Sequence, residues 1–107
     1  MAKIDWTENF LQLLHYYIDN ANEDYGKTTA IRWSEEIAEF ENRLRSFPES
    51  YPPEELLRNR KIIYRRCHIM NRRFKLIYTY DEINDIVHLI DIWDTKRNPS
   101  ALIRRIK

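Results

Sequence analysis

Two mainly apolar segments on either side of a turn restrict the possible fold of this chain more than any other part of it. They run from Phe74 to Tyr80 and from Ile86 to Trp93, and both are rich in β-branched and aromatic residues. The turn-like residues Asp81 to Asp85 lie between them. Segments of this length joined by turn residues are typical of a β-hairpin at the centre of a sheet. The segment from Lys61 to Ile69 predicts a third strand, which precedes the hairpin.

The N-terminal half predicts two helices that pack against this sheet. Lys3 to Trp6 is expected to form a short opening strand, and Thr7 is expected to cap a first helix that ends near Asn22. A second helix is predicted from about Lys27 to Phe47, because apolar residues recur there at spacings of three and four. Pro48 follows and stops it. The short connection between the helices predicts that they lie antiparallel.

The remaining segments complete one predicted domain over residues 1–107. Ser46 to Asn59 contains three prolines and is expected to be a loop. Ser100 to Lys107 predicts a short closing helix, with Asn98 as its cap and Pro99 at its first position. The fold class is therefore expected to be α+β, with an N-terminal helical hairpin packed on one face of a small antiparallel sheet.

The composition excludes several kinds of site. The chain contains one glycine, so glycine-rich phosphate loops are excluded, and one cysteine, Cys67, so no internal disulfide forms. The histidines His15, His68 and His88 are far apart and have no partners at ligand spacing, so we expect no metal and no cofactor. No apolar segment is long enough to cross a bilayer or to act as a signal sequence. A cytoplasmic protein without a membrane partner is expected.

The charge is distributed unevenly along the chain. Residues 1–57 contain five Lys or Arg and twelve Asp or Glu, a net charge of −7. Residues 58–107 contain thirteen Lys or Arg and five Asp or Glu, a net charge of +8. Such asymmetry indicates either that the basic half binds a polyanion or only that the surface is well solvated. We favour polyanion binding, because the basic residues lie on and around predicted strands rather than in one tail.

The basic residues of the predicted sheet are the candidate site. The candidates for target binding are Arg65, Arg72, Arg73, Lys75, Trp93, Lys96 and Arg97. Arg65 and Arg66 are adjacent on one strand and point to opposite sides, so only one of them can join a given face. We expect Arg65, Lys75 and Arg97 to converge on the side of the sheet away from the helices. Such a cluster can bind phosphates or acidic side chains, and Trp93 offers a ring for base stacking.

Three motifs carry a resemblance to a known family. They are Tyr64-Arg65, Phe74-Lys75-Leu76-Ile77-Tyr78 and Lys96-Arg97-Asn98-Pro99, and they follow an opening strand, a helical hairpin and a proline-containing loop. In this order they resemble the RelE/ParE superfamily of bacterial toxins over nearly the whole chain. The resemblance implies the toxin component of a type II toxin–antitoxin system, neutralised by a cognate antitoxin. RelE-like members cleave mRNA on the ribosome without a metal, whereas ParE-like members act on DNA gyrase.

The resemblance also assigns residues and modes of action. Arg65 and Lys75 match the basic strand residues that serve the phosphate in RelE-like enzymes, so the candidate catalytic residues are Arg65, Lys75 and Arg97. RelE-like enzymes often use a His or Tyr near the C-terminus, but none follows Trp93 here. The sequence therefore slightly favours the gyrase-directed mode, without nuclease activity. The alternatives are a ribosome-dependent, metal-independent endoribonuclease and a non-toxic module that binds RNA or protein.

The expected partners follow from the same reasoning. The cognate antitoxin is expected to present an acidic and apolar segment that covers the helical hairpin, the edge of the sheet or the cationic face. The target is expected to be gyrase or the ribosome with its mRNA. No small-molecule cofactor is expected.

Overall fold

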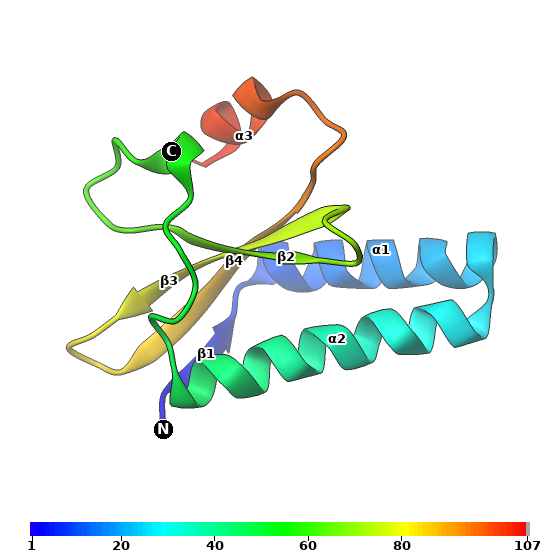
Figure 1. Cartoon of the computed structure of the whole chain (residues 1–107), viewed down its shortest axis with the longest axis horizontal. Coiled ribbons are helices and arrows are strands. Elements are labelled where there is room, and N and C mark those ends of the chain that lie inside the picture. The colour runs from blue at the N-terminus through cyan, green and yellow to red at the C-terminus, as the bar shows by residue number, and fades with distance from the viewer. Residues whose placement is uncertain (107) are drawn as a thin grey trace.

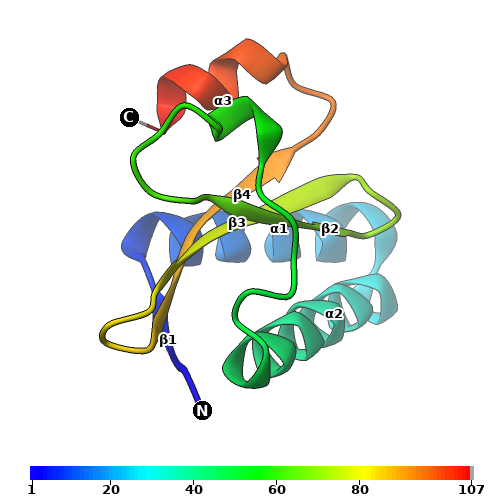
Figure 2. The same cartoon turned by 60° about the vertical axis from the view of Figure 1, so that its left-hand side comes forward.

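The fold is that of a computed structural model, which describes residues 1–106. Its elements are β1 (Lys3–Trp6), α1 (Glu8–Tyr25), α2 (Lys27–Ser46), the 3-10 turn η1 (Glu55–Leu57), β2 (Arg65–Ile69), β3 (Phe74–Asp81), β4 (Ile86–Asp94) and α3 (Pro99–Arg105). The strands form one sheet in the order β1-β4-β3-β2. The helical hairpin of α1 and α2 lies on one side of this sheet, and α3 lies on the other (Figures 1 and 2). The predicted α+β class with a helical hairpin, a central β3–β4 hairpin and a short C-terminal helix is confirmed.

The sheet is mixed, so the prediction of a purely antiparallel sheet is wrong. β1 lies parallel to β4, whereas the β2–β3 and β3–β4 pairs are antiparallel. The amide of Lys3 donates to the carbonyl of Asp85 at 3.0 Å, and the amide of Thr7 donates to the carbonyl of Leu89 at 3.3 Å. A parallel pair needs a long connection, and here the two helices, β2 and β3 lie between the paired strands.

The helices begin and end close to the predicted residues. Thr7 caps α1 as predicted, because its Oγ1 accepts from the amide of Phe10 at 3.3 Å. α1 continues three residues past Asn22, the predicted end, and stops before Gly26. Gly26 has a φ of 94°, which favours glycine, and its amide donates to the carbonyl of Asn22 at 3.1 Å. α2 ends one residue before Phe47, the predicted last residue.

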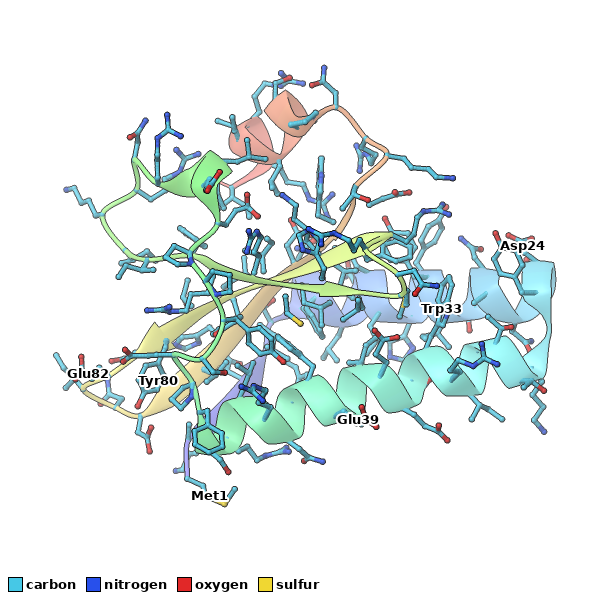
Figure 3. All side chains as sticks on the ribbon, in the orientation of Figure 1. Met1, Asp24, Trp33, Glu39, Tyr80 and Glu82 are labelled. Carbon is cyan, nitrogen blue, oxygen red and sulfur yellow. The ribbon has the colours of Figure 1, made fainter. Side chains whose placement is uncertain are left out.

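The main hydrophobic core fills the space between the helical hairpin and the sheet. Its buried side chains include Phe10, Ile37, Phe40, Leu44, Leu76, Tyr78, Val87 and Leu89. Side chains from both layers occupy this space (Figure 3). On β3, Phe74, Leu76 and Tyr78 belong to this core, so every second side chain of the strand faces the helices.

A smaller core lies on the opposite side of the sheet, under α3 and η1. Its buried residues are Leu57, Ile77, Trp93, Leu102 and Ile106. Asn98 caps α3 as predicted, since its Oδ1 accepts from the amide of Ser100 at 3.0 Å. α3 ends at Arg105, and Lys107, the last residue of the predicted helix, lies outside the described residues. β2 begins at Arg65 rather than Lys61. No helix within residues 1–106 combines the length and the apolar composition that a membrane crossing requires.

Candidate anion-binding face

Three side chains form a row across the sheet, on the side that faces away from the helical hairpin. His68 lies opposite Lys75 in the β2–β3 pair, and Lys75 lies opposite Trp93 in the β3–β4 pair. Phe74 and Leu76, the neighbours of Lys75 on β3, pack in the core below the helices. Because side chains alternate along a strand, Lys75 points to the α3 side. The row therefore places an imidazole, an ammonium group and an indole on one side of the sheet.

A buried carboxylate holds two cations of this surface in place. The Nζ of Lys75 donates to Oε2 of Glu54 at 2.9 Å, and the Nε of Arg66 lies 3.7 Å from the same oxygen. The Glu54 side chain is 2% exposed, and its Oε1 accepts from the amide of Leu56 at 3.2 Å. Lys75 forms a charge-assisted hydrogen bond with Glu54, which is stronger than a neutral one, and Arg66 forms an ion pair with the same carboxylate. Glu54 therefore positions Lys75 and partly neutralises both cations.

Trp93 positions Arg97 rather than offering a ring for base stacking. The guanidinium carbon of Arg97 lies 4.8 Å from the centroid of the indole, and that of Arg105 lies 5.6 Å from it. The Trp93 side chain is 2% exposed, so the predicted stacking role does not fit its position. A guanidinium group over an indole is held by the charge distribution of the ring. Arg97 itself is exposed and lies at the edge of the row.

His68 is the group of this face that is best suited to accept a proton. Burial lowers the pKa of His68, and the positive charges of Arg72, Arg66 and Lys75 lower it further. The imidazole is therefore neutral at neutral pH, although it is surrounded by cations. A neutral imidazole beside positive charges can accept a proton from a hydroxyl group. His68 has no partner at ligand spacing in the sequence, so nothing in the sequence alone singled it out.

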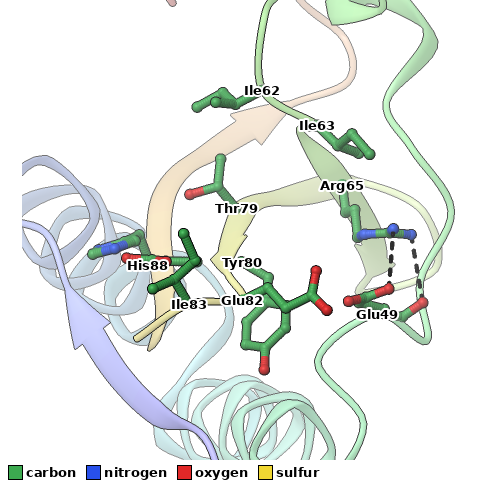
Figure 4. Close-up of a pocket in the computed structure, with 10 residues that line it drawn as sticks. Glu49, Ile62, Ile63, Arg65, Thr79, Tyr80, Glu82, Ile83 and His88 are labelled. Carbon is green, nitrogen blue, oxygen red and sulfur yellow. Dashed lines mark hydrogen bonds and ion pairs between the residues drawn. The ribbon is translucent and has the colours of Figure 1, made fainter. Parts of the chain in front are cut away.

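Arg65 does not join Lys75, so the predicted convergence of these two residues is wrong. Arg65 lies opposite Tyr78 in the β2–β3 pair, and Tyr78 is buried below the helical hairpin. The Nη1 of Arg65 donates to the carbonyl of Glu49 at 3.4 Å, and its Nη2 lies 4.0 Å from the carboxylate of that residue (Figure 4). Arg66, the next residue, takes the predicted place beside Lys75.

The other predicted residues lie at the end of the sheet where β2 turns into β3. Arg73 forms an ion pair with Asp94, with the Nε 3.3 Å from Oδ1. The amide of Thr95 donates to the carbonyl of Arg73 at 2.9 Å, and its Oγ1 donates to the carbonyl of Arg72 at 2.8 Å. These bonds join the loop after β4 to the β2–β3 turn. Arg72 and Lys96 are exposed on these two segments.

Together these residues define what we call the anion-binding face: Arg66, His68, Lys75 and Arg97. Their elements are β2, β3 and the loop before α3. Three of the four carry a fixed positive charge, and His68 lies among them. Positive guanidinium and ammonium groups on one side of a sheet can bind phosphate oxygens by charge and by directed hydrogen bonds.

Metal and thiol chemistry have little support in this face. Residues 1–106 contain no group of three or more His, Cys, Asp or Glu side chains placed to hold a metal ion. Cys67 is buried on the helix side of β2. Burial raises the pKa of its thiol, which disfavours the reactive thiolate.

Neither protein-family models nor curated proteins give a significant match to this chain. The resemblance to the RelE/ParE superfamily therefore stays a prediction, which depends on the motifs and on the order of the elements.

Proposed function

We propose that this protein is the toxin component of a type II toxin–antitoxin system of the RelE/ParE kind. It arrests growth by binding an anionic target through the anion-binding face, and a cognate antitoxin neutralises it. The observation that carries this proposal is the grouping of Arg66, His68, Lys75 and Arg97 on the side of the sheet opposite the helical hairpin. Lys75 and Arg97 belong to two of the motifs that suggested the family, whereas Arg65 of the third motif lies outside the grouping.

The chemistry of the face supports RNA as the target. Cleavage of RNA requires a group that accepts the proton of the 2′-hydroxyl, a cation beside the phosphate and an acid for the leaving oxygen. His68 is able to accept a proton, and Lys75 and Arg66 supply positive charge beside it. The preference for gyrase depended on the absence of His and Tyr after Trp93, and His68 offers a substitute from β2.

A growth experiment tests the role of the face. The chain is expressed from an inducible promoter in a bacterium without the antitoxin, and growth is followed for the wild type and for Arg66→Ala, His68→Gln and Arg97→Ala. We expect arrest by the wild type and weaker arrest by each variant, because a lost charge-assisted contact weakens phosphate binding about tenfold or more. Arg32→Ala is the matched control, since Arg32 is exposed on α2, an element of the helical hairpin. Full toxicity of a stable Arg66→Ala/Arg97→Ala double variant would contradict the proposal.

An in vitro experiment separates the targets. Purified protein is added to a translation extract and, separately, to DNA gyrase with relaxed plasmid. Ribosome-dependent cleavage of the transcript that is lost in His68→Gln supports the nuclease, whereas lost supercoiling with intact transcripts supports gyrase. If the protein binds RNA but neither cleaves the transcript nor inhibits supercoiling, it is a binding module. Its affinity for RNA should then fall steeply as the salt concentration rises.

A further inference from the structure

A second surface lies at the other end of the sheet, where β3 has a free edge. β2 pairs with β3 only as far as Tyr78, which lies opposite Arg65. The residues Thr79–Asp81 continue the strand without a neighbour on that edge. Figure 4 shows Thr79 and Tyr80 on this part of the strand, with Ile62 and Ile63 nearby.

The backbone of Tyr80 points toward the free edge. The amide of Arg66 donates to the carbonyl of Pro52 at 3.0 Å, so Arg66 directs its backbone away from β3. The preceding residue, Arg65, therefore directs its backbone toward β3 and toward its partner Tyr78. Two residues further along β3, Tyr80 directs its N–H and C=O groups to the same edge. Within residues 1–106, no backbone group outside the strands hydrogen-bonds to Tyr80 there.

An apolar groove of about 540 Å³ adjoins this edge. Ile62, Ile63 and Ile83 line it, with side chains that are 55%, 58% and 95% exposed. They come from the segment before β2 and from the β3–β4 turn (Figure 4). Exposed branched side chains gathered around an open strand edge are unusual for a surface that faces only water.

The charges around the groove are mainly negative. Glu49, Asp81 and Glu82 line it. Its two basic residues already have acidic partners, since Arg65 lies 4.0 Å from Glu49 and His88 lies 2.6 Å from Asp5. Two copies of this chain paired at this edge would bring their carboxylates together, which disfavours self-association. A partner that carries Lys or Arg beside apolar side chains would complement the groove instead.

We infer that the free edge of Thr79–Asp81 binds an extended, basic segment of a partner protein, which adds to the sheet as a further strand. Backbone hydrogen bonds to Tyr80 hold the segment, and its alternate apolar side chains cover Ile62, Ile63 and Ile83. Its Lys or Arg side chains meet the carboxylates of the groove. This inference concerns a surface separate from the anion-binding face, and it stands whether or not the proposed function is correct.

The probe is a short synthetic peptide of alternating valine and lysine, blocked at both ends. Its binding to the full chain is followed by NMR shifts of the backbone amides. We expect shifts at Thr79–Asp81, Ile62 and Ile83, and slower hydrogen exchange of the Tyr80 amide in the complex. Two control peptides should each bind at least about tenfold more weakly. A valine–glutamate peptide loses the charge complementarity, and a valine–lysine peptide methylated on alternate backbone nitrogens loses the backbone hydrogen bonds.

Variants of exposed residues localise the site without loss of the fold. The double variant Ile62→Ser/Ile83→Ser should bind the valine–lysine peptide about tenfold more weakly. Ile31→Ser is the matched control and should leave binding unchanged, because Ile31 is 47% exposed on α2. The inference would be overturned if the valine–lysine peptide did not bind, or if its NMR shifts were confined to another surface. It would also be overturned if the valine–glutamate peptide bound equally well. If the chain forms a dimer in solution and Ile83→Ser abolishes that dimer, the occupant of the groove is a second copy of the chain and the inference is overturned.

Discussion

Asp91 is expected to make the protein less stable as the pH rises from about 4 to about 6. Its side chain is 1% exposed, and its Oδ1 accepts from Nη2 of Arg105 at 2.8 Å. Oδ2 is buried and has no hydrogen-bond partner among residues 1–106. Burial raises the pKa of Asp91 from 3.8 to about 6, and the opposing charge of Arg105 does not offset this effect.

The direction of this pH dependence follows from the difference in proton affinity between the folded and unfolded states. Because the folded state holds the proton of Asp91 more tightly than the unfolded state, protonation stabilises the folded state. This stabilisation is complete below pH 3.8 and is lost as the pH rises through about 6. A shift of one pKa unit corresponds to about 1.4 kcal/mol, so the free energy of unfolding should fall by about 3 kcal/mol across this range from Asp91 alone.

The Asp91→Asn variant isolates this contribution, because Asn keeps the shape of the side chain but does not titrate. Urea unfolding of the wild type and the variant at a series of pH values between about 4 and 8 gives the difference in unfolding free energy at each pH. We expect the wild type to lose about 3 kcal/mol relative to Asp91→Asn over the series. A difference that rises with pH would mean that Arg105 governs the carboxylate, and the argument from burial would then be refuted.

Three further predictions concern single contacts. Lys75→Met should lower the free energy of unfolding by about 2–3 kcal/mol in urea, because Glu54 would remain buried without its closest cation. Adding Glu54→Gln to Lys75→Met should recover most of that loss. If the two substitutions instead lower the stability by the sum of their separate effects, the pairing is contradicted. Thr7→Ala should cost about 1 kcal/mol and lower the Tm, since it removes the cap of α1, whereas Thr7→Ser should retain most of the stability. Tyr78→Phe should cost about 1 kcal/mol by thermal unfolding, because the hydroxyl donates to the carbonyl of Pro48 at 2.9 Å, and an unchanged Tm would exclude that bond in solution.

Local patterns were sufficient for most elements, but the direction of β1 depends on distant contacts. The apolar periodicity of α2, the cap at Thr7 and the turn between β3 and β4 are properties of neighbouring residues, and they predicted those elements to within a few residues. The pairing of β1 with β4 is a property of residues more than eighty positions apart, such as Lys3 and Ile86. The four residues of β1 give no indication of their neighbour, so the mixed sheet was not predicted.

The alternation of side chains along β2 was sufficient to predict which of Arg65 and Arg66 lies beside Lys75. Cys67 and Ile69 are buried on the helix side of β2, and Arg65 shares their parity. The alternation of apolar and polar residues in this strand therefore already indicated that Arg66 and His68 face the other side. The expected convergence of Arg65 with Lys75 and Arg97 did not use this alternation, and the match to the family motif then supported the same choice. Glu54, in contrast, lies in a loop whose sequence has no period, so its place under the cations could not be predicted.

Glu54 determines how the charge of the anion-binding face is available to a target. Its carboxylate already occupies the space between Arg66 and Lys75, so a phosphate that reaches them must share or displace this partner. Arg97 has no carboxylate within 4.0 Å among residues 1–106, and Trp93 holds it at the rim of the face. In the proposed function, Arg97 therefore provides the long-range attraction and the first contact. Arg66 and Lys75 then bind at short range, because Glu54 already orders their side chains.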